Sequence, residues 1–448
     1  MEPFASDFWH QYRGLPALVV RPGTTAEVAA LVRHAGQHGV SIVPQSGNTG
    51  LVHGSIPDDT GTQLVLSLGR LNRIRRIDPV GNTVVAEAGC VLAAVQAAAA
   101  GVDRLFPLSL GAEGTCQIGG NLSTNAGGLN VLRYGMARDL VLGVEAVMAD
   151  GNVYEGLTSL RKNNTGYDLK QLLIGSEGTL GIITAAELRL SPAVRERVTV
   201  WLAVEDPAAA VTLFRRFRES FGELLSSFEL LESWGVEAAV TQFGLTRPVG
   251  VAHPWHVVSE VAWSFTSGLR DRVEEALAGM LDDGLCRDGT IAETEQQRLS
   301  MWRIREGQSE ATRPYGDIIR SDVAVAIGDI PALIAHAAAD VPPNVRLLAF
   351  GHVGDGNLHL NFVVPPSETG RLRPLLLDAL YRNVMTLGGS ISAEHGVGRA
   401  KRDAVLKQKS PLELDLMRRL KRTLDPAGLL NPGVVLPTTA TGSRSPQG

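Results

Sequence analysis

Length, composition and charge place this chain among globular proteins and exclude several classes. It has 448 residues, enough for two or three domains, with 44% hydrophobic and 20% charged residues. The net charge of −5 disfavours a nucleic-acid partner, no window is apolar enough for a transmembrane segment, and residues 1–16 lack a secretory signal pattern. The three scattered cysteines, Cys90, Cys116 and Cys286, fit a reducing compartment and exclude a disulfide scaffold or a cysteine zinc cluster, so we expect a cytoplasmic protein.

The first half of the chain predicts short strands and helices separated by loops. Thr24 and Glu27 form a capping-box pattern that opens a helix over 24–39. The residues from 105 to 128 predict mostly loop, and an Asp-Gly turn at 150–151 predicts a hairpin over 140–154. The other predicted elements are strands over 40–43, 64–68 and 83–88 and an alanine-rich helix over 91–100.

The pattern changes near residue 193, after which glycine becomes rarer and the regular elements lengthen. This alternation of strands and helices is typical of an α+β layer, with helices on one face of an antiparallel sheet. We therefore place a domain boundary near residue 193, and expect the small, polar tail over 438–448 to be disordered. The predicted strands are 198–204, 228–231 and 257–263, and the predicted helices are 207–221, 269–281 and 293–312.

Glycine is the unusual residue, with 49 in 448 positions, or about 11% against a typical share of about 7%. Many gather in three loops, over 45–50, 111–128 and 175–181. The backbone N–H groups of the first loop could hold a phosphate, although an ordinary turn is the more frequent explanation of that loop alone. The second loop is too long and too polar to anchor itself by burial, and favours an extended ligand. Together the loops indicate a large nucleotide cofactor, without a Rossmann or P-loop motif.

A different candidate site lies in the second half of the chain. His352 and His359 are seven residues apart, and Glu394 stands beside a third histidine, His395. Two histidines and one carboxylate suit zinc or a similar divalent ion with an open coordination position. Spacing alone leaves a structural role for the histidines equally open. If a metal binds, His395 could serve as a general base.

Three arginines lie upstream of this candidate site, at Arg303, Arg305 and Arg320. A guanidinium can bind a carboxylate through two parallel N–H groups, so one or two of these residues could hold an acidic substrate. Most arginines on a helix face solvent instead, and the sequence pattern alone does not choose between the two.

Six segments resemble the FAD-linked D-2-hydroxyacid dehydrogenases, a family that includes D-2-hydroxyglutarate dehydrogenase and belongs to the FAD-linked oxidases of the vanillyl-alcohol oxidase type. The segments occur in order over 20–193 and 300–437, whereas 194–299 resembles the family only in its pattern of elements. They are PQSGNTGLVHGS, GAEGTCQIGGNLSTNAGGLNVLRYGMARDLVLG, NNTGYDLKQLLIGSEGTLGIIT, GHVGDGNLHLN, SAEHGVGRAK and NPGVVLP.

The resemblance implies an α+β fold with two domains. An FAD-binding domain of two subdomains would cover 1–193, joined by a returning segment over 425–437, and an α+β cap domain with the substrate and metal sites would cover 194–424. FAD would be non-covalent, because Asn48 stands where some relatives carry a flavin-linked histidine. His53 stands where relatives usually have glycine. The implied cofactor contacts are Gln45, Ser46, Gly47, Asn48, Thr49, Gly50, Thr115, Gly119, Ser123, Thr124, Gly181, Ile183 and Asn431.

The resemblance also implies roles for the second candidate site. Its metal ligands would be His352, His359 and Glu394, with zinc as the expected metal, and its general base would be His395. The implied substrate-binding residues are Arg305, Ser309, Arg320 and Asn361. Ser309 replaces a threonine of the family, and Arg320 replaces a lysine that holds the distal carboxylate of the substrate. Because a planar guanidinium is not equivalent to a lysine, a D-2-hydroxy acid is more firmly implied than 2-hydroxyglutarate itself.

The expected reaction is oxidation of a D-2-hydroxy acid, 2-hydroxyglutarate or a related dicarboxylate such as malate, to the 2-oxo acid, with hydride transfer to flavin N5. Three alternatives stay open: a D-lactate or glycolate dehydrogenase of the same family, a flavin-free metal-dependent hydrolase, and a flavin-binding module without turnover. The expected electron acceptor is an electron-transfer flavoprotein or a quinone-like molecule. A homodimer is one expected assembly.

Overall fold

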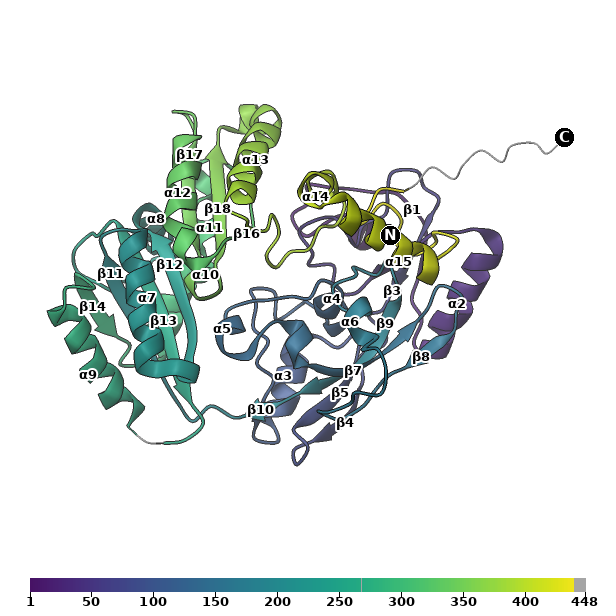
Figure 1. The fold of residues 1–448 in the computed structure, drawn as a ribbon, viewed down its shortest axis with the longest axis horizontal. Coiled ribbons are helices and arrows are strands. Elements are labelled where there is room, and N and C mark those ends of the chain that lie inside the picture. Colours follow the sequence, from purple (N-terminus) through teal and green to yellow (C-terminus); the bar gives the residue numbers. More distant parts are fainter. Residues whose placement is uncertain (267, 439–448) are drawn as a thin grey trace.

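A computed structural model describes residues 1–266 and 268–438 of the protein. Figure 1 shows two parts, each built from sheets and helices, with the last helices of the chain lying beside the first part. The predicted mixed α+β class is confirmed. The tail predicted to be disordered, residues 438–448, lies outside the described residues except for residue 438.

The first sheet of the N-terminal part is small and parallel. A helix packs on it, and the predicted cap is confirmed because the Thr24 hydroxyl accepts the backbone N–H of Glu27. Gly39 ends that helix in the left-handed region, at φ 66°. The elements are α1 (Glu2–Ala5), α2 (Thr25–His38) and the strands β1 (Pro16–Val20), β3 (Gln63–Ser67) and β2 (Ile42–Gln45), in that sheet order.

The second sheet of this part has five antiparallel strands. The predicted hairpin is confirmed, and Gly151 in its turn adopts φ 79°, which glycine reaches without strain. Helix α3 (Leu92–Ala100) packs into the same core. The strands, in sheet order, are β4 (Ile74–Asp78), β5 (Thr83–Glu87), β9 (Ile182–Arg189), β7 (Val141–Val147) and β8 (Val153–Glu155).

The segment 105–128 is mostly loop, as predicted, and also contains one short helix, α4 (Ile118–Ser123). Packing overrides the low helix propensity of glycine here. A Cβ on Gly119 would lie 2.7 Å from the Cβ of Ala88, so only glycine allows this approach. The remaining short elements of the N-terminal part are α5 (Val131–Tyr134), α6 (Lys170–Leu173), β6 (Arg104–Leu105) and β10 (Ser191–Pro192).

The second part is built on one antiparallel sheet of eight strands. Strand β16 pairs with β18 outside the main order. In sheet order, the strands are β14 (Asp288–Ile291), β11 (Glu196–Val204), β13 (Trp255–Trp263), β12 (Leu225–Glu232), β17 (Arg346–His352), β18 (Asn357–Val364) and β15 (Asp317–Ile319), with β16 at Val323–Ala324.

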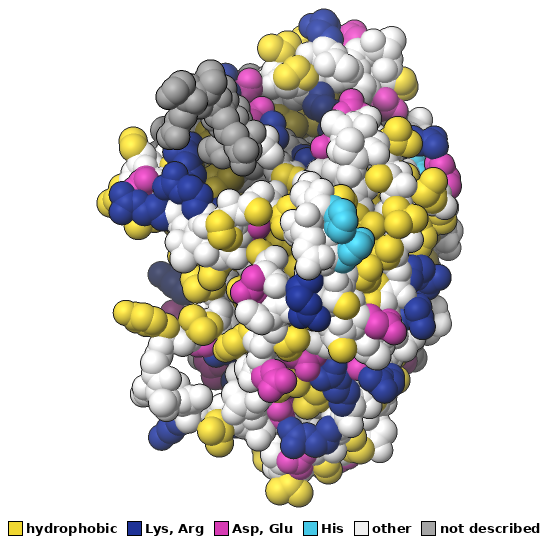
Figure 2. All heavy atoms as spheres, turned by 90° about the vertical axis from the view of Figure 1, so that its right-hand side faces the viewer, with side chains coloured by type: hydrophobic (Ala, Val, Ile, Leu, Met, Phe, Trp, Pro, Cys, Tyr) yellow, Lys and Arg dark blue, Asp and Glu magenta, His cyan; other side chains and the backbone are white. Residues whose placement is uncertain are grey.

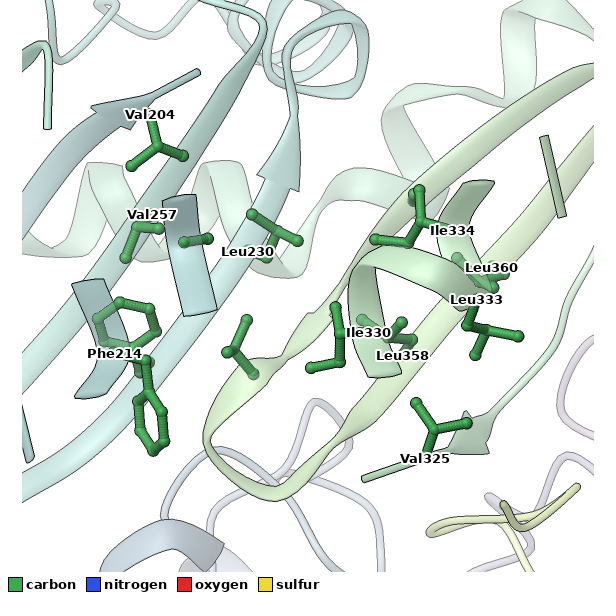
Figure 3. Packing of buried hydrophobic residues seen from close by; sticks show 14 of the residues in the cluster. Val204, Phe214, Leu230, Val257, Val325, Ile330, Leu333, Ile334, Leu358 and Leu360 are labelled. Carbon is green, nitrogen blue, oxygen red and sulfur yellow. The ribbon is translucent and has the colours of Figure 1, made fainter. Parts of the chain in front are cut away.

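Helices cover both faces of this sheet, whereas the sequence predicted helices on one face only. On β11, Val200 and Leu202 pack toward one set of helices and Trp201 toward the other, so both faces of the strand are apolar and no alternation marks a free face. Figure 3 shows side chains of β11, β12, β13 and β18 meeting those of α7 and α12. The first face carries α7 (Pro207–Phe221), α9 (Leu269–Asp282), α12 (Ile330–Ala339) and α13 (Thr369–Thr386), and the second carries α8 (Ser233–Phe243), α10 (Glu295–Glu306) and α11 (Gln308–Ala311).

The helix predicted over 293–312 is interrupted between α10 and α11 at Gly307. A Cβ there would lie 2.3 Å from a ring carbon of Phe243, so the close contact with α8 requires glycine.

After α13, the chain returns to the first part through α14 (Arg402–Gln408) and α15 (Pro411–Leu424), and Leu430 forms a parallel bridge with Ile42. On the face of the molecule drawn in Figure 2, side chains of both charges are interspersed with apolar ones.

Candidate active site

A cavity of about 580 Å³ lies between the two parts of the molecule. The glycine-rich segments 46–50 and 120–128 line it from the first part, and Arg305, His352 and His395 line it from the second. Its volume falls within the range of about 300–1,000 Å³ typical of ligand pockets. The two sites that the sequence predicted separately therefore face one cavity.

The side of this cavity that belongs to the second part is one face of three neighbouring strands, β12, β17 and β18. His352 ends β17, and His359 and Asn361 stand two residues apart on β18, so their side chains share a face. The register of β12 with β17 places Glu229 opposite His352. Antiparallel pairing brings together polar groups that are far apart in the sequence.

The predicted metal ligands lie close enough together to share one ion. One ligand atom from each of His352, His359 and Glu394 lies within 4.8 Å of the others, and Asp322, His359 and His395 form a second set at the same spacing. Asp322 is the poorer ligand, because its Oδ2 already accepts the backbone N–H groups of residues 393, 394 and 395 at 3.2, 3.0 and 2.9 Å. The geometry favours the first set.

A buried glutamate, Glu229, positions two groups of the site. Its Oε1 lies 2.8 Å from Nδ1 of His352, and its Oε2 accepts Nε–H of Arg305 at 2.7 Å. Burial opposes the charged form, but His352 and Arg305 outweigh it and lower the pKa of Glu229 to about 2. Since Nδ1 of His352 pairs with Glu229, Nε2 is the nitrogen that faces Glu394, at 3.9 Å from its Oε2, and a metal there would replace the longer contact of Nε2 with Arg305.

A second buried carboxylate, Asp322, shapes the loop that carries Glu394 and His395. Its Oδ1 accepts Nδ2 of Asn357 at 3.0 Å, while its Oδ2 lies 3.6 Å from Nδ1 of His395 and 3.8 Å from Nζ of Lys401. Burial lowers the pKa of His395, and the opposing effect of Asp322 is smaller. The ring is therefore neutral near pH 7 and can accept a proton.

The four predicted substrate residues line the same cavity without forming one cluster. Arg305 lies beside His352, with 3.4 Å between Nη2 and Nε2. Nδ2 of Asn361 donates to the Ser309 hydroxyl at 3.1 Å, which links these two side chains. Arg320 lies apart, between β15 and β16, and its guanidinium carbon is 4.2 Å from the ring centre of Trp9.

The predicted cofactor residues fall into two groups. Gln45 and Asn431 are buried. The side-chain amide of Gln45 donates to the carbonyl oxygen of Ser55, and that of Asn431 donates to the carbonyl oxygens of Gly54 and Glu177. These two side chains therefore hold loops together rather than face the cavity. The cavity lining includes Ser46, Gly47, Asn48, Thr49, Gly50, Ser123, Thr124 and Ile183, and it omits Gln45, Thr115, Gly119, Gly181 and Asn431.

The loop after β2 fits a cofactor that carries phosphate groups. Within the described residues, no hydrogen bond occupies the backbone N–H groups of residues 47–50, which line the cavity. A Cβ on Gly47 would lie 2.5 Å from the carbonyl oxygen of Thr115, so only glycine allows the two loops to approach this closely. Unpaired N–H groups of successive residues can bind an anion.

Sequence reasoning missed three residues that organise the site, Glu229, Asp322 and Glu177. Glu229 had a usable signal, because a carboxylate within the apolar strand FELLE must be paired if it is buried. Glu177 belongs to the third glycine-rich loop, where its carboxylate accepts the backbone N–H groups of Val397 and Gly398 at 2.7 and 2.8 Å. Glu177 therefore joins a loop of the first part to the segment that follows His395.

Two family models match the chain. The model described as "FAD binding domain" matches residues 16–156, and the model described as "FAD linked oxidases, C-terminal domain" matches residues 193–435. The second match alone covers more than half of the chain. The strands that carry Glu229, His352 and His359 lie within it.

Curated relatives match nearly the full length of the chain. A mitochondrial D-2-hydroxyglutarate dehydrogenase of Arabidopsis thaliana is 37% identical, covering 98% of this chain and 78% of the relative, and that of Bos taurus is 40% identical, covering 98% and 80%. A D-2-hydroxyglutarate dehydrogenase of Xanthomonas citri pv. viticola is 36% identical, covering 100% and 95%.

The expected cytoplasmic location was wrong, because the names of the Arabidopsis and Bos relatives point to mitochondria. The expectation relied on the three scattered cysteines, which the structure shows to be free, and on the absence of a secretory signal pattern. Free thiols are typical of reducing interiors in general, so they could not separate one such compartment from another.

Solved structures share the fold at low sequence identity. p-Cresol methylhydroxylase with bound substrate aligns with a TM-score of 0.76 at 18% identity, over 97% of this chain and 92% of that chain. Alkyldihydroxyacetonephosphate synthase aligns with a TM-score of 0.71 at 17% identity, over 94% and 77%. The expected fold of the vanillyl-alcohol oxidase type is confirmed, and no helix in the described part of the chain is long and apolar enough to cross a membrane. Sequence and fold together show that the chain belongs to the FAD-linked oxidases and is an FAD-binding oxidoreductase.

Proposed function

We propose that the protein is an FAD- and metal-dependent dehydrogenase that oxidises a D-2-hydroxy acid with a second carboxylate, 2-hydroxyglutarate or a related dicarboxylate such as malate. One observation carries this proposal: a single cavity is lined by the glycine-rich loops, by the set His352, His359 and Glu394, and by His395. The names of relatives that are 36–40% identical support the substrate class.

The FAD-binding domain of this proposal comprises residues 1–193 together with 425–437, and the cap domain comprises residues 194–424. The bridge between Ile42 and Leu430 supports the inclusion of the returning segment. FAD is held non-covalently by the loop over 46–50, with Ser123, Thr124 and Ile183 nearby in the lining. When bound, FAD supplies the acceptor for the substrate hydride.

The metal of this proposal is zinc, held by His352, His359 and Glu394. Three protein ligands of this kind leave one coordination position open, as in catalytic zinc sites. When bound, the ion supplies a Lewis acid that lowers the pKa of a hydroxyl group. Glu229 keeps the ring of His352 in the orientation that such a ligand needs.

The other side chains of the cavity bind the substrate or accept its proton. Arg305 binds the carboxylate next to the reacting carbon, and the linked pair Ser309 and Asn361 adds hydrogen-bonding groups. His395 accepts the proton of the C2 hydroxyl group. Arg320 binds the distal carboxylate. A separate acceptor, an electron-transfer flavoprotein or a quinone-like molecule, then takes the electrons of the reduced flavin. The expected homodimer stays a prediction.

Anaerobic titration with D-2-hydroxy acids tests the proposal. The purified protein should be yellow, and a D-2-hydroxy dicarboxylate should bleach its flavin absorbance without oxygen, because reduced flavin absorbs less visible light. A colourless protein would favour a metal-dependent hydrolase. A yellow protein that no D-2-hydroxy acid bleaches would favour a flavin-binding module without turnover.

Replacing Arg320 with alanine should weaken dicarboxylate substrates by roughly 10- to 150-fold in kcat/KM, the value of a charge-assisted hydrogen bond of about 1.5–3 kcal/mol. D-lactate, which has no distal carboxylate, should be nearly unaffected. Arg320→Lys should favour the longer dicarboxylate if reach decides the preference. The measurement is kcat/KM for lactate, malate and 2-hydroxyglutarate with all three proteins.

Equal losses of kcat/KM for all three acids would mean that Arg320 supports the fold instead of binding the substrate. If the wild-type protein prefers lactate, the dicarboxylate assignment fails and a D-lactate dehydrogenase takes its place.

A further inference from the structure

Two arginines of the cap contact one aromatic ring at the edge of the cavity. The guanidinium carbons of Arg313 and Arg320 lie 4.5 and 4.2 Å from the ring centre of Trp9. Within the described residues, neither guanidinium forms an ion pair with a carboxylate. Burial, together with the charges of Arg313 and Arg373, lowers the pKa of Arg320 to about 10. The positive charge at this wall is therefore left for an anionic ligand to neutralise.

Trp9 belongs to the N-terminal segment, residues 1–13, which is firmly attached to the first part. Nδ2 of Asn48 donates to the carbonyl oxygens of Pro3 and Ser6 at 3.2 and 2.9 Å. Nε2 of Gln45 donates to the carbonyl oxygen of Phe4 at 3.1 Å. Two residues predicted to contact the cofactor thus hold this segment in place.

A stacked pair of rings adds a third attachment. The rings of Tyr12 and His53 lie 4.6 Å apart and are tilted by 9°. His53 adopts φ 64°, a left-handed conformation that costs a residue with a Cβ more than it costs glycine. The stacking on Tyr12 offsets part of the cost of this conformation at His53.

The attached segment brings its aromatic residues to the cavity wall. Phe8 and Trp9 both line the cavity, as does Arg320. The indole Nε1 of Trp9 is buried and has no hydrogen-bond partner within the described residues. A buried N–H group without a partner is costly, which fits a wall that a polar ligand completes.

We propose that Trp9 is a specificity-determining residue, which positions the guanidinium group of Arg320 by cation–π contact for the second carboxylate of the substrate. The inference rests on the proposed function and deepens it. An aromatic ring can hold a cation without neutralising its charge, whereas an acidic partner would compete with the substrate. The cap supplies the charges and the N-terminal segment keeps them in place.

Variants of Trp9 test the inference in the full-length, FAD-loaded protein. Trp9→Leu should raise KM for 2-hydroxyglutarate roughly 2- to 30-fold, the range expected from loss of a cation–π contact, and leave kcat nearly unchanged. D-lactate kinetics should not change. Trp9→Phe should recover most of the loss, because a phenyl ring also attracts a guanidinium. FAD content, read from flavin absorbance, should be normal in both variants.

Trp234 offers a matched control, because the guanidinium carbon of Arg346 lies 4.2 Å from its ring centre and Trp234 lies outside the cavity lining. Trp234→Leu should leave the ratio of kcat/KM between 2-hydroxyglutarate and lactate unchanged. Trp9→Gln keeps the test available if Trp9→Leu fails to fold, because an amide side chain has no aromatic face, and it too should raise KM for the dicarboxylate alone.

Equal losses for lactate and 2-hydroxyglutarate in the Trp9 variants, or no loss for either acid, would overturn the inference and leave the proposed function standing. If no D-2-hydroxy acid bleaches the flavin of the wild-type protein, the proposed function fails, and the inference fails with it.

Discussion

Replacing His395 with alanine should lower the rate of flavin reduction by roughly 10²–10⁴, the usual contribution of a positioned general base. His395 lines the cavity, Asp322 lies beside its Nδ1, and burial keeps the ring neutral near pH 7. No other histidine in the cavity is equally free, because His352 is held by Glu229 and both His352 and His359 belong to the proposed metal set. The measurement is the single-turnover rate of flavin bleaching under anaerobic conditions.

His34→Ala is the matched control, because His34 is exposed on α2, outside the cavity lining. It should leave the rate unchanged. FAD and metal content should be normal in His395→Ala, which separates loss of the base from loss of a cofactor. If the rate of the alanine variant equals that of the wild type at every pH, His395 is not the base.

Removal of the metal with a chelator should abolish flavin reduction and leave FAD bound. The proposed ligands come from β17, β18 and the loop with Glu394, whereas the loops that fit the cofactor come from the N-terminal part. Loss of the ion therefore leaves the FAD contacts intact. The measurement pairs flavin absorbance after desalting with the bleaching rate on adding substrate.

Restoring zinc to the chelated protein should recover the rate, which distinguishes metal loss from irreversible damage. Glu394→Ala should reproduce the chelated state without a chelator, with FAD still bound. Full activity in protein shown to be free of metal would rule out the proposed role of His352, His359 and Glu394.

Local features of the chain were predictable because a few neighbouring residues determine them. The cap at Thr24, the turn at Asp150-Gly151 and the helix at 207–221 all formed as predicted. The set of His352, His359 and Glu394 was predicted because two of the ten histidines are seven residues apart, because Glu394 stands beside a third histidine, and because these segments resemble the family. The structure brings one ligand atom of each within 4.8 Å of the others.

The features that depend on pairing between distant segments were not predictable. Glu229 reaches His352 only through the register of β12 with β17, across 123 residues of chain. Asp322 contacts three backbone N–H groups of a loop that begins some 70 residues later. Likewise, the helices on both faces of the cap sheet follow from tertiary packing, which no pattern within one strand reveals.

The bridge between Ile42 and Leu430 affects how the chain can fold during its synthesis. Ile42 donates its N–H to Leu429 and accepts the N–H of Asn431, both at 2.8 Å, so β2 gains these bonds only after residue 431 has been made. A growing chain whose first 193 residues have left the ribosome therefore carries this sheet with β2 as an open edge. Until residue 431 has been added, that edge can pair with another chain, so slow elongation or early termination should promote aggregation.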